Sequence, residues 1–191
     1  MVAPVRVPLA VLCVVLFGSF ARADLQLTPE VAEYELDGAK LSHLVFPDGS
    51  QRVNYTPPHG WQYVGDNSRF ILHPKSDLGA EAIINTVKLP QPQIFDESTM
   101  KRLSDEVIAS LPSAATHVTI ASQQKNPVVI ENKETFLIIV NYDCYGTLYA
   151  RSVMFLNRRG EQMRFQLTSS LRNFAQLQKQ FLSSHFSWQN L

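Results

Sequence analysis

Residues 134–143 read ETFLIIVNYD, and this stretch determines the fold class that we expect. In an extended strand, Phe136, Ile138 and Val140 point to one side, while Leu137 and Ile139 point to the other. Apolar residues on both sides predict a central strand whose two faces are both covered. The sequence therefore predicts a sheet with other structure packed on each side.

Further strands are expected around this one. In Gln162–Thr168, apolar Met163, Phe165 and Leu167 alternate with polar residues, which is typical of a strand with one exposed face. Residues 157–160 (NRRG) form a short loop before it, so the neighbouring strands should be antiparallel. The other strands predicted in this half of the chain are His117–Ser122, Val128–Glu131 and Thr147–Asn157.

Two segments have the period of an amphipathic helix. In the first, Asp96 is a suitable N-cap and Pro112 ends the helix. In the second, Ser170 can cap the helix. The inward faces consist of Met100, Leu103, Val107 and Leu111 in the first helix and of Phe174, Leu177, Phe181, Leu182 and His185 in the second.

The N-terminal part has the turn signals of a β-meander. Asp37-Gly38 and Pro47-Asp48-Gly49 suit tight turns, because Gly accepts a positive φ and Asp tolerates it. We expect a signal segment at 1–23, a meander extension at 24–54 and one main domain at 55–191. Strands are predicted at Lys40–Phe46, Gln51–Tyr55, Trp61–Val64, Arg69–His73 and Ala82–Leu89. The fold class is α+β, with a mostly antiparallel sheet flanked by two amphipathic helices.

This order of elements resembles the PsbP/Mog1-like α/β/α sandwich family. Two stretches carry the resemblance. Residues 55–61 (YTPPHGW) are similar to the Pro-x-Gly-Trp motif at the start of that group's domain, and residues 164–169 (RFQLTS), which run into the last helix, are similar to its final strand and helix. The resemblance covers Tyr55 to Trp188 and implies a binding or assembly accessory. It implies no shared catalytic residues, so none is transferred.

The composition excludes several classes of protein. The 191 residues carry 17 Lys and Arg against 17 Asp and Glu, a balance that argues against a nucleic-acid partner. No apolar tract is long enough for a polytopic membrane protein. The two cysteines cannot supply a disulfide framework.

Met1–Ala23 has the layout of a secretory signal peptide. It contains Arg6, the apolar run Val7–Phe17, and small residues at Ala21 and Ala23, which predict cleavage after Ala23. A membrane anchor needs about 20 apolar residues, and this run is shorter. Lipoprotein processing at Cys13 is disfavoured, because Leu12 precedes it where a small residue is expected.

Cleavage changes the charge and the expected location. The loss of Arg6 and Arg22 takes the formal net charge from zero to −2, and the loss of Cys13 leaves Cys144 as the one cysteine. We expect a secreted or periplasmic protein without an integral membrane anchor.

Cys144 is the one candidate nucleophile. A catalytic thiol needs a base that produces the thiolate, and no histidine is near it in sequence. A structural thiol is the favoured interpretation, because free cysteine behaves mostly as a small buried apolar residue.

The histidines show no metal-ligand spacing. None of His43, His59, His73, His117 and His185 forms a short pair. No metal site and no cofactor is predicted, although a zinc site assembled from distant residues stays open.

Aromatic residues give the best candidate for a partner surface. Tyr142, Tyr145 and Tyr149 surround one turn together with Arg151, and Trp61 could add to such a surface. For the tyrosines, cross-strand pairing is an equally good interpretation. For Trp61, anchoring in the core is favoured over a role in binding.

Two functional hypotheses follow. The first is an exported, non-enzymatic binding or accessory protein that acts through a surface patch on a protein or small ligand. The second is an envelope enzyme with Cys144 as its nucleophile, and a metal-binding module is a weaker third.

Overall fold

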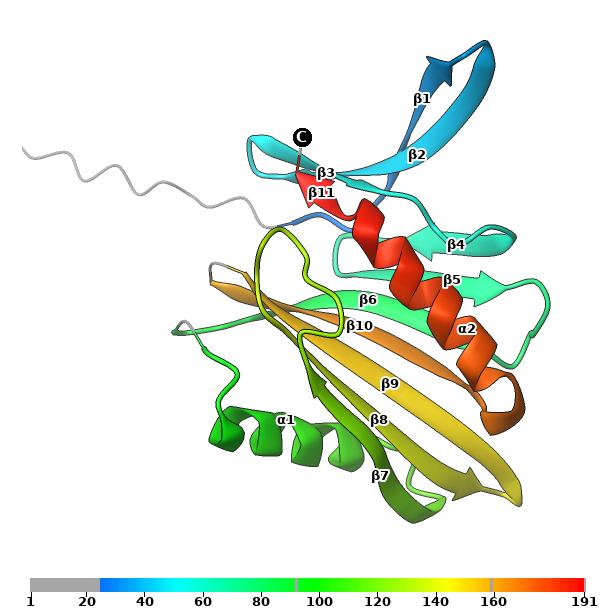
Figure 1. Cartoon of the computed structure of the whole chain (residues 1–191), viewed down its shortest axis with the longest axis vertical. Helices are drawn as coiled ribbons and strands as arrows, with labels where there is room; N and C mark the ends of the chain where they lie inside the picture. Colours follow the sequence, from blue (N-terminus) through cyan, green and yellow to red (C-terminus); the bar gives the residue numbers. More distant parts are fainter. Residues whose placement is uncertain (1–24, 92, 159, 191) are drawn as a thin grey trace, which may run out of the picture.

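The computed structural model describes residues 25–91, 93–158 and 160–190, so the predicted signal peptide lies outside the described residues. Two sheets dominate the architecture (Figure 1). The smaller sheet has the order β1 (Glu30–Leu36), β2 (Ala39–Asp48), β3 (Gln51–Tyr55) and β11 (Gln189–Asn190). The larger sheet has the order β4 (Trp61–Gly65), β5 (Arg69–Pro74), β6 (Glu81–Lys88), β10 (Glu161–Ser170), β9 (Thr147–Arg158), β8 (Thr135–Cys144) and β7 (Ala115–Lys125).

All the strand pairs in the two sheets are antiparallel. Tight hairpins account for much of this arrangement. Between β8 and β9, Tyr145 and Gly146 both have positive φ (53° and 78°), which is the geometry that matches the twist of a two-residue hairpin. The α+β class predicted from the sequence therefore agrees with the structure.

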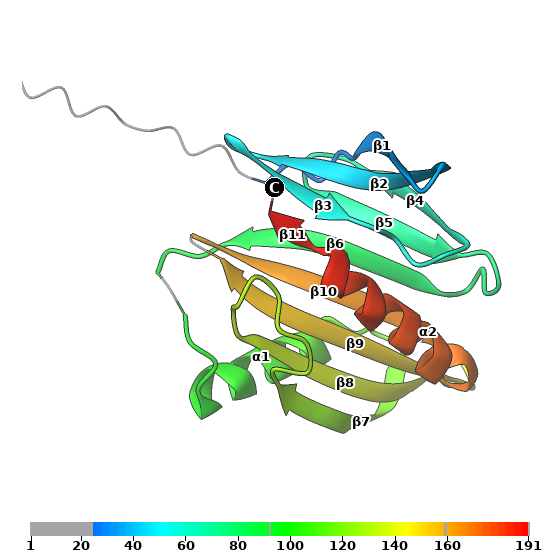
Figure 2. The ribbon, with the colours of Figure 1, turned by 45° about the horizontal axis from the view of Figure 1, so that its top comes forward.

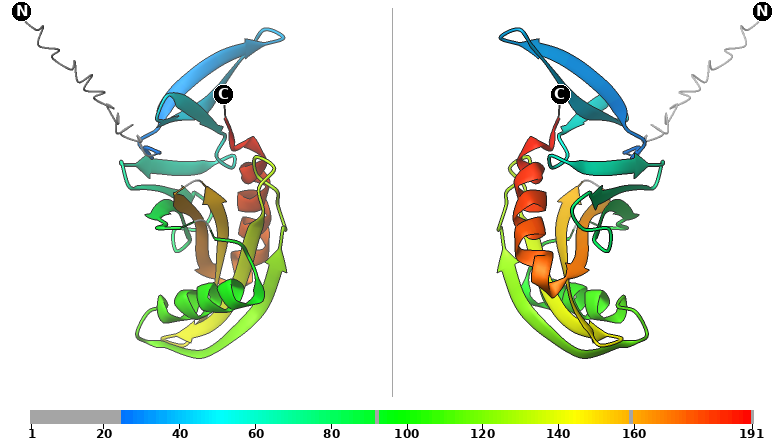
Figure 3. Two further views of the ribbon diagram at one scale, coloured as in Figure 1. Left: turned by 90° about the vertical axis from the view of Figure 1, so that its left-hand side faces the viewer. Right: turned by 90° about the vertical axis from the view of Figure 1, so that its right-hand side faces the viewer.

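The helices α1 (Glu97–Ala109) and α2 (Leu171–Ser184) lie on opposite faces of the larger sheet (Figures 2 and 3). The predicted cap of α1 is confirmed, since the Asp96 carboxylate accepts a hydrogen bond from the Thr99 backbone at 2.7 Å. Ser170 is the N-cap of α2, but its side chain makes no capping bond. A 3₁₀ turn, η1 (His185–Ser187), follows α2.

The prediction of a central strand with two covered faces is confirmed. Phe136, Ile138 and Val140 of β8 belong to the core cluster under α1. Leu137 belongs to the cluster on the other face, and Ile139 packs against it. The alternation in β10 is also confirmed, with Met163, Phe165 and Leu167 buried and Arg164, Gln166 and Thr168 half-buried.

The prediction of a strand at Val128–Glu131 is wrong. These residues lie in a loop that has a single isolated bridge, Ile130 to Lys133. Asn126, Glu131 and Asn132 have positive φ, which interrupts an extended strand. Val128 and Ile130 are apolar because the loop folds onto the core and buries them.

The small sheet shares its core with the large one. Phe46 and Tyr55 of the small sheet contact Phe70 of β5 and Trp188, which precedes β11, with ring centroids 5.2–6.0 Å apart. An ion pair between Arg158 of β9 and Asp48 of β2 also joins the two sheets. Leu44, Phe46 and Val53 of the predicted meander extension are thus packed into one core with the main domain.

Candidate functional site

The α1 face of the large sheet is covered over only part of its width. The term covered half denotes the β8 and β9 residues that lie under α1, namely Phe136, Ile138, Val140, Val153 and Phe155. We call the open half the residues on the same face of β4, β5, β6 and β10, namely Val64, Ile71, Ile83, Asn85, Arg164 and Gln166. The strand register places both halves in continuous rows, for example Val64, Ile71, Ile83, Gln166 and Val153.

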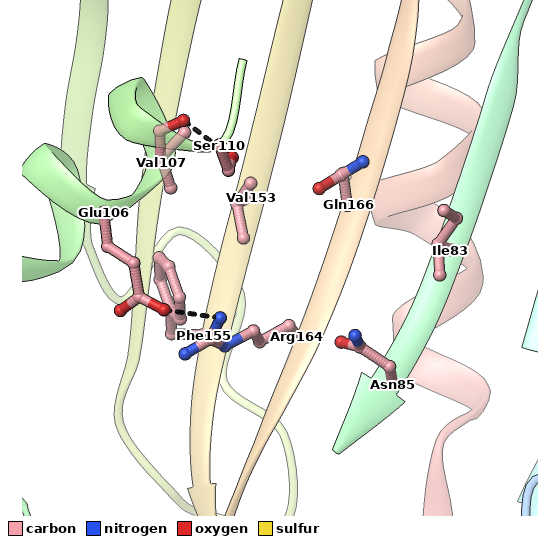
Figure 4. A pocket seen from close by; sticks show the side chains of 9 residues that line it. All are labelled: Ile83, Asn85, Glu106, Val107, Ser110, Val153, Phe155, Arg164 and Gln166. Carbon is pink, nitrogen blue, oxygen red and sulfur yellow. Dashed lines mark hydrogen bonds and ion pairs between the residues drawn. The ribbon is translucent and has the colours of Figure 1, made fainter. Parts of the chain in front are cut away.

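A pocket of about 130 Å³ lies where the two halves meet (Figure 4). Its walls come from one side of α1 and from the sheet strands β6, β9 and β10. The lining side chains are Ile83, Asn85, Glu106, Val107, Ser110, Val153, Phe155, Arg164 and Gln166.

Arg164 is the fixed charge of the pocket. Its Nη1 lies 2.8 Å from Oε1 of Glu106, and its Nε donates a hydrogen bond to Oε1 of Gln162 at 3.3 Å. The guanidinium carbon lies 5.6 Å from the centre of the Phe155 ring, within cation–π range. These contacts hold the guanidinium in one place, with only 23% of its side chain exposed.

Glu106 is held less firmly than Arg164. Its side chain is 41% exposed, and Oε2 lies 3.6 Å from Nη1 of Arg102 on the next turn of α1. One carboxylate therefore lies between two arginines, one in the pocket and one outside it.

Two amide side chains in the pocket have no hydrogen-bond partner among the described residues. Neither the Asn85 nor the Gln166 side chain forms a hydrogen bond with another residue that the structure describes. Both are half-buried, and Figure 4 shows them beside Arg164 on adjacent strands. They leave hydrogen-bond donors and acceptors available to a ligand.

Arg151 fastens the C-terminal end of α1 to the sheet. Its Nη1 donates to the Ser110 carbonyl at 3.0 Å, and its Nε donates to Oγ1 of Thr168 at 3.0 Å. This arginine was expected on a partner surface, and the structure gives it these internal bonds beside the pocket.

The residues predicted as a partner surface lie in two separate places. Trp61 is buried, with its ring stacked on Phe181 at 6.0 Å and its Nε1 donating to Gln180. Tyr142 and Tyr149 are cross-strand partners with stacked rings 5.7 Å apart. Tyr145 is 90% exposed at the tip of the hairpin. The structure thus brings the three tyrosines together, away from Trp61.

Within the tyrosine cluster, burial shifts the pKa of Tyr142. Burial is the largest influence on Tyr142 and raises the pKa of its hydroxyl, while the positive charge of Arg151 lowers it. The hydroxyl therefore stays protonated at neutral pH.

Cys144 and the histidines form no catalytic or metal-binding constellation in the described part of the chain. Cys144 is free and half-buried at the end of β8. His185 is buried between the rings of Phe165 and Phe181, both 4.5 Å away, and desolvation lowers its pKa to about 3. Within residues 25–91, 93–158 and 160–190, no group of three or more His, Cys, Asp and Glu residues could hold a metal ion.

The sequence-based reasoning missed the pocket residues. The alternation in their strand predicts an exposed face for Arg164 and Gln166, whereas the structure half-buries both. Asn85 and Glu106 carry no local motif. Only the strand register and the position of α1 bring the four side chains together.

No protein-family profile and no curated protein matches the sequence. Several solved structures resemble the chain, including the following two. The solution structure of cyanobacterial PsbP (CyanoP) from Synechocystis sp. PCC 6803 is 12% identical, covers 91% of this chain and 96% of its own, and has a TM-score of 0.47. The crystal structure of protein PA94 from Pseudomonas aeruginosa, of unknown function, is 15% identical, with coverages of 78% and 90% and a TM-score of 0.42.

The Synechocystis protein agrees in name with the PsbP part of the resemblance seen in the sequence, and neither of the two is named as a Mog1 protein. At these scores, neither structure identifies functional residues in this chain. Among the described residues, no helix has the length and apolar character needed to cross a membrane.

Proposed function

We propose that this protein is an exported, non-enzymatic binding or accessory protein whose ligand site is the pocket between α1 and the sheet. The observation that carries the proposal is the combination in one pocket of a fixed guanidinium and two unpartnered amides. Polar groups that converge in a concave, partly apolar site are typical of small-molecule binding.

The lining favours binding over catalysis. It contains no histidine and no cysteine, and its one carboxylate, Glu106, is paired with Arg164. General acid–base or nucleophilic chemistry needs a group that can take up a proton or attack, with a partner that activates it.

A titration of the purified protein with a small-molecule library, followed by ¹H–¹⁵N NMR, tests this proposal. The side-chain amide signals of Asn85 and Gln166 report directly on the pocket. We expect ligands that shift these signals and also raise the melting temperature, because a ligand that binds only the folded state stabilises it. Steady turnover of a substrate by the purified protein would contradict the non-enzymatic part.

The hairpin tip is a second candidate surface, because Tyr145 is a large side chain with 90% of its surface exposed. A pull-down with the Tyr145→Ala variant tests it, with Leu148→Ala as a control from the same hairpin, where the side chain is 54% exposed. Loss of a specific partner in the first variant alone would assign binding to the tip.

Export rests on the predicted signal peptide at residues 1–23. Mass spectrometry of the protein made in its native host tests it. We expect a mature chain that begins at Asp24, and a chain that retains residues 1–23 would contradict the prediction.

A further inference from the structure

We infer that the pocket binds the carboxylate of a small branched apolar acid, which takes the place of Glu106 on Arg164. This inference rests on the proposed function, because it names the ligand class of the same pocket. In the absence of ligand, Glu106 acts as an internal stand-in for the ligand's carboxylate.

Arg164 is prepared for such a ligand. A guanidinium presents a planar set of donors that matches a carboxylate, and it binds best when its orientation is already fixed. Phe155 and Gln162 provide that fixation without using the whole set of donors. The group that occupies Nη1 is the carboxylate of Glu106, at 2.8 Å.

Glu106 can leave at small cost. Ion pairs that are open to solvent contribute little to stability, and the Glu106 side chain is 41% exposed. The second carboxylate oxygen already lies 3.6 Å from Arg102, so Glu106 keeps a positive partner when it releases Arg164. The exchange leaves neither carboxylate without a cation.

The amides supply the remaining polar contacts. Asn85 on β6 is directly opposite Arg164 in the strand register, and Gln166 follows Arg164 on the same face of β10. An amide NH₂ beside a guanidinium can donate to the second oxygen of a bound carboxylate. Both amides are free for this role, because neither is hydrogen-bonded to a described residue.

The apolar walls and the volume define the rest of the ligand. Ile83, Val107 and Val153 supply apolar surface to the pocket, and Gln166 lies between Ile83 and Val153 in the strand register. An apolar cavity of about 150 Å³ holds a molecule the size of benzene. A pocket of about 130 Å³ therefore suits a branched tail of about four carbons. A free short-chain acid or the C-terminal carboxylate of a peptide that ends in valine would present this chemistry.

An NMR titration with matched ligands tests the inference. The probes are 3-methylbutanoate against 3-methylbutanamide, and acetyl-Ala-Val with a free C-terminus against the same peptide amidated. We expect each acid to shift the Asn85 and Gln166 amide signals and to bind about tenfold more tightly than its amide. Comparison of the two acids identifies the source of the carboxylate.

Two variants of opposite sign complete the test. Arg164→Gln should weaken acid binding about tenfold, and Glu106→Gln should strengthen it about two- to fivefold, because the internal competitor is gone. The controls are Lys101→Gln and Asp105→Asn, which make the same charge changes in an exposed pair on α1. Should Arg164→Gln fail to fold, the sign of the Glu106→Gln effect still decides.

Two results overturn the inference. If the amides bind the pocket as tightly as the acids, or if Glu106→Gln weakens acid binding, the ligand class is wrong while the pocket remains a binding site. If no library compound shifts the pocket signals, the proposed function fails as well.

Discussion

The two faces of the large sheet differ in how completely they are covered. On the α2 face, one cluster runs from the small sheet across β4, β5, β6, β10 and β9 to Leu137 of β8. On the α1 face, the cluster draws its sheet residues from β8 and β9 alone, and the open half begins at the next strand. The difference indicates that the α2 face provides most of the stability, whereas the α1 face has room for a ligand at the edge of its helix.

The largest expected effect is on the α2 face. Phe181→Ala should lower the free energy of unfolding by about 3–5 kcal/mol, because Phe181 is 1% exposed and its ring contacts Trp61 and His185. Urea denaturation measures this loss. Leu171→Ala, in the first turn of the same helix and 39% exposed, is the control and should cost less than about 1 kcal/mol. Equal losses in the two variants would contradict the assignment of the core to this face.

The same face should be sensitive to acid through His185. Burial lowers its pKa to about 3, while the unfolded state has the ordinary value of 6.5, so the unfolded state binds the proton first as the pH falls. The stabilisation is fully present above pH 6.5 and is lost progressively below it, and the loss amounts to roughly 3 kcal/mol by pH 4.5.

Urea denaturation of the parent protein and of the His185→Leu variant, each at pH 7 and pH 4.5, measures this effect. The variant removes the titrating group and keeps an apolar side chain between Phe165 and Phe181. It should lose clearly less stability on acidification than the parent protein. An identical loss in both proteins would show that His185 is not the group responsible.

The same substitution, Val→Thr, at two positions of one cross-strand row compares the two halves of the α1 face. Val153 of the covered half is 4% exposed, and Val64 of the open half is 61% exposed. Val153→Thr should cost about 1–3 kcal/mol, because it buries a hydroxyl group in an apolar site.

Val64→Thr, at the other end of that row, should change the free energy of unfolding by less than about 0.5 kcal/mol. The same denaturation assay measures both variants. A loss at Val64 as large as that at Val153 would mean that the open half is part of the core.

Sequence periodicity was enough to predict the layers of this fold. Residues 134–143 and 162–168 show their burial directly, because side chains in a strand alternate between faces. Periodicity misled at Val128 and Ile130, where a loop with positive φ buries apolar residues without forming a strand. The pattern of apolar residues in a sequence indicates which side chains are buried. It does not show whether a strand or a loop buries them.

The candidate site was beyond the reach of local pattern. Arg164 and Glu106 are 58 positions apart in sequence, and their contact depends on where α1 settles on the sheet. The proximity of Tyr142, Tyr145 and Tyr149 was predictable because one hairpin holds them, whereas Trp61 lies far from this hairpin under α2.

The pairing of β3 with β11 has a consequence for the order of folding. It joins Val53 and Asn54 to residues 189–190, and the nearby hydrogen bond between the hydroxyls of Tyr55 and Ser184 spans 129 positions. Contacts between such distant segments form slowly, and they cannot form until both segments are available. During synthesis, the small sheet therefore cannot be completed until the residues that follow α2 are available. A truncation there would destabilise strands near the opposite end of the sequence.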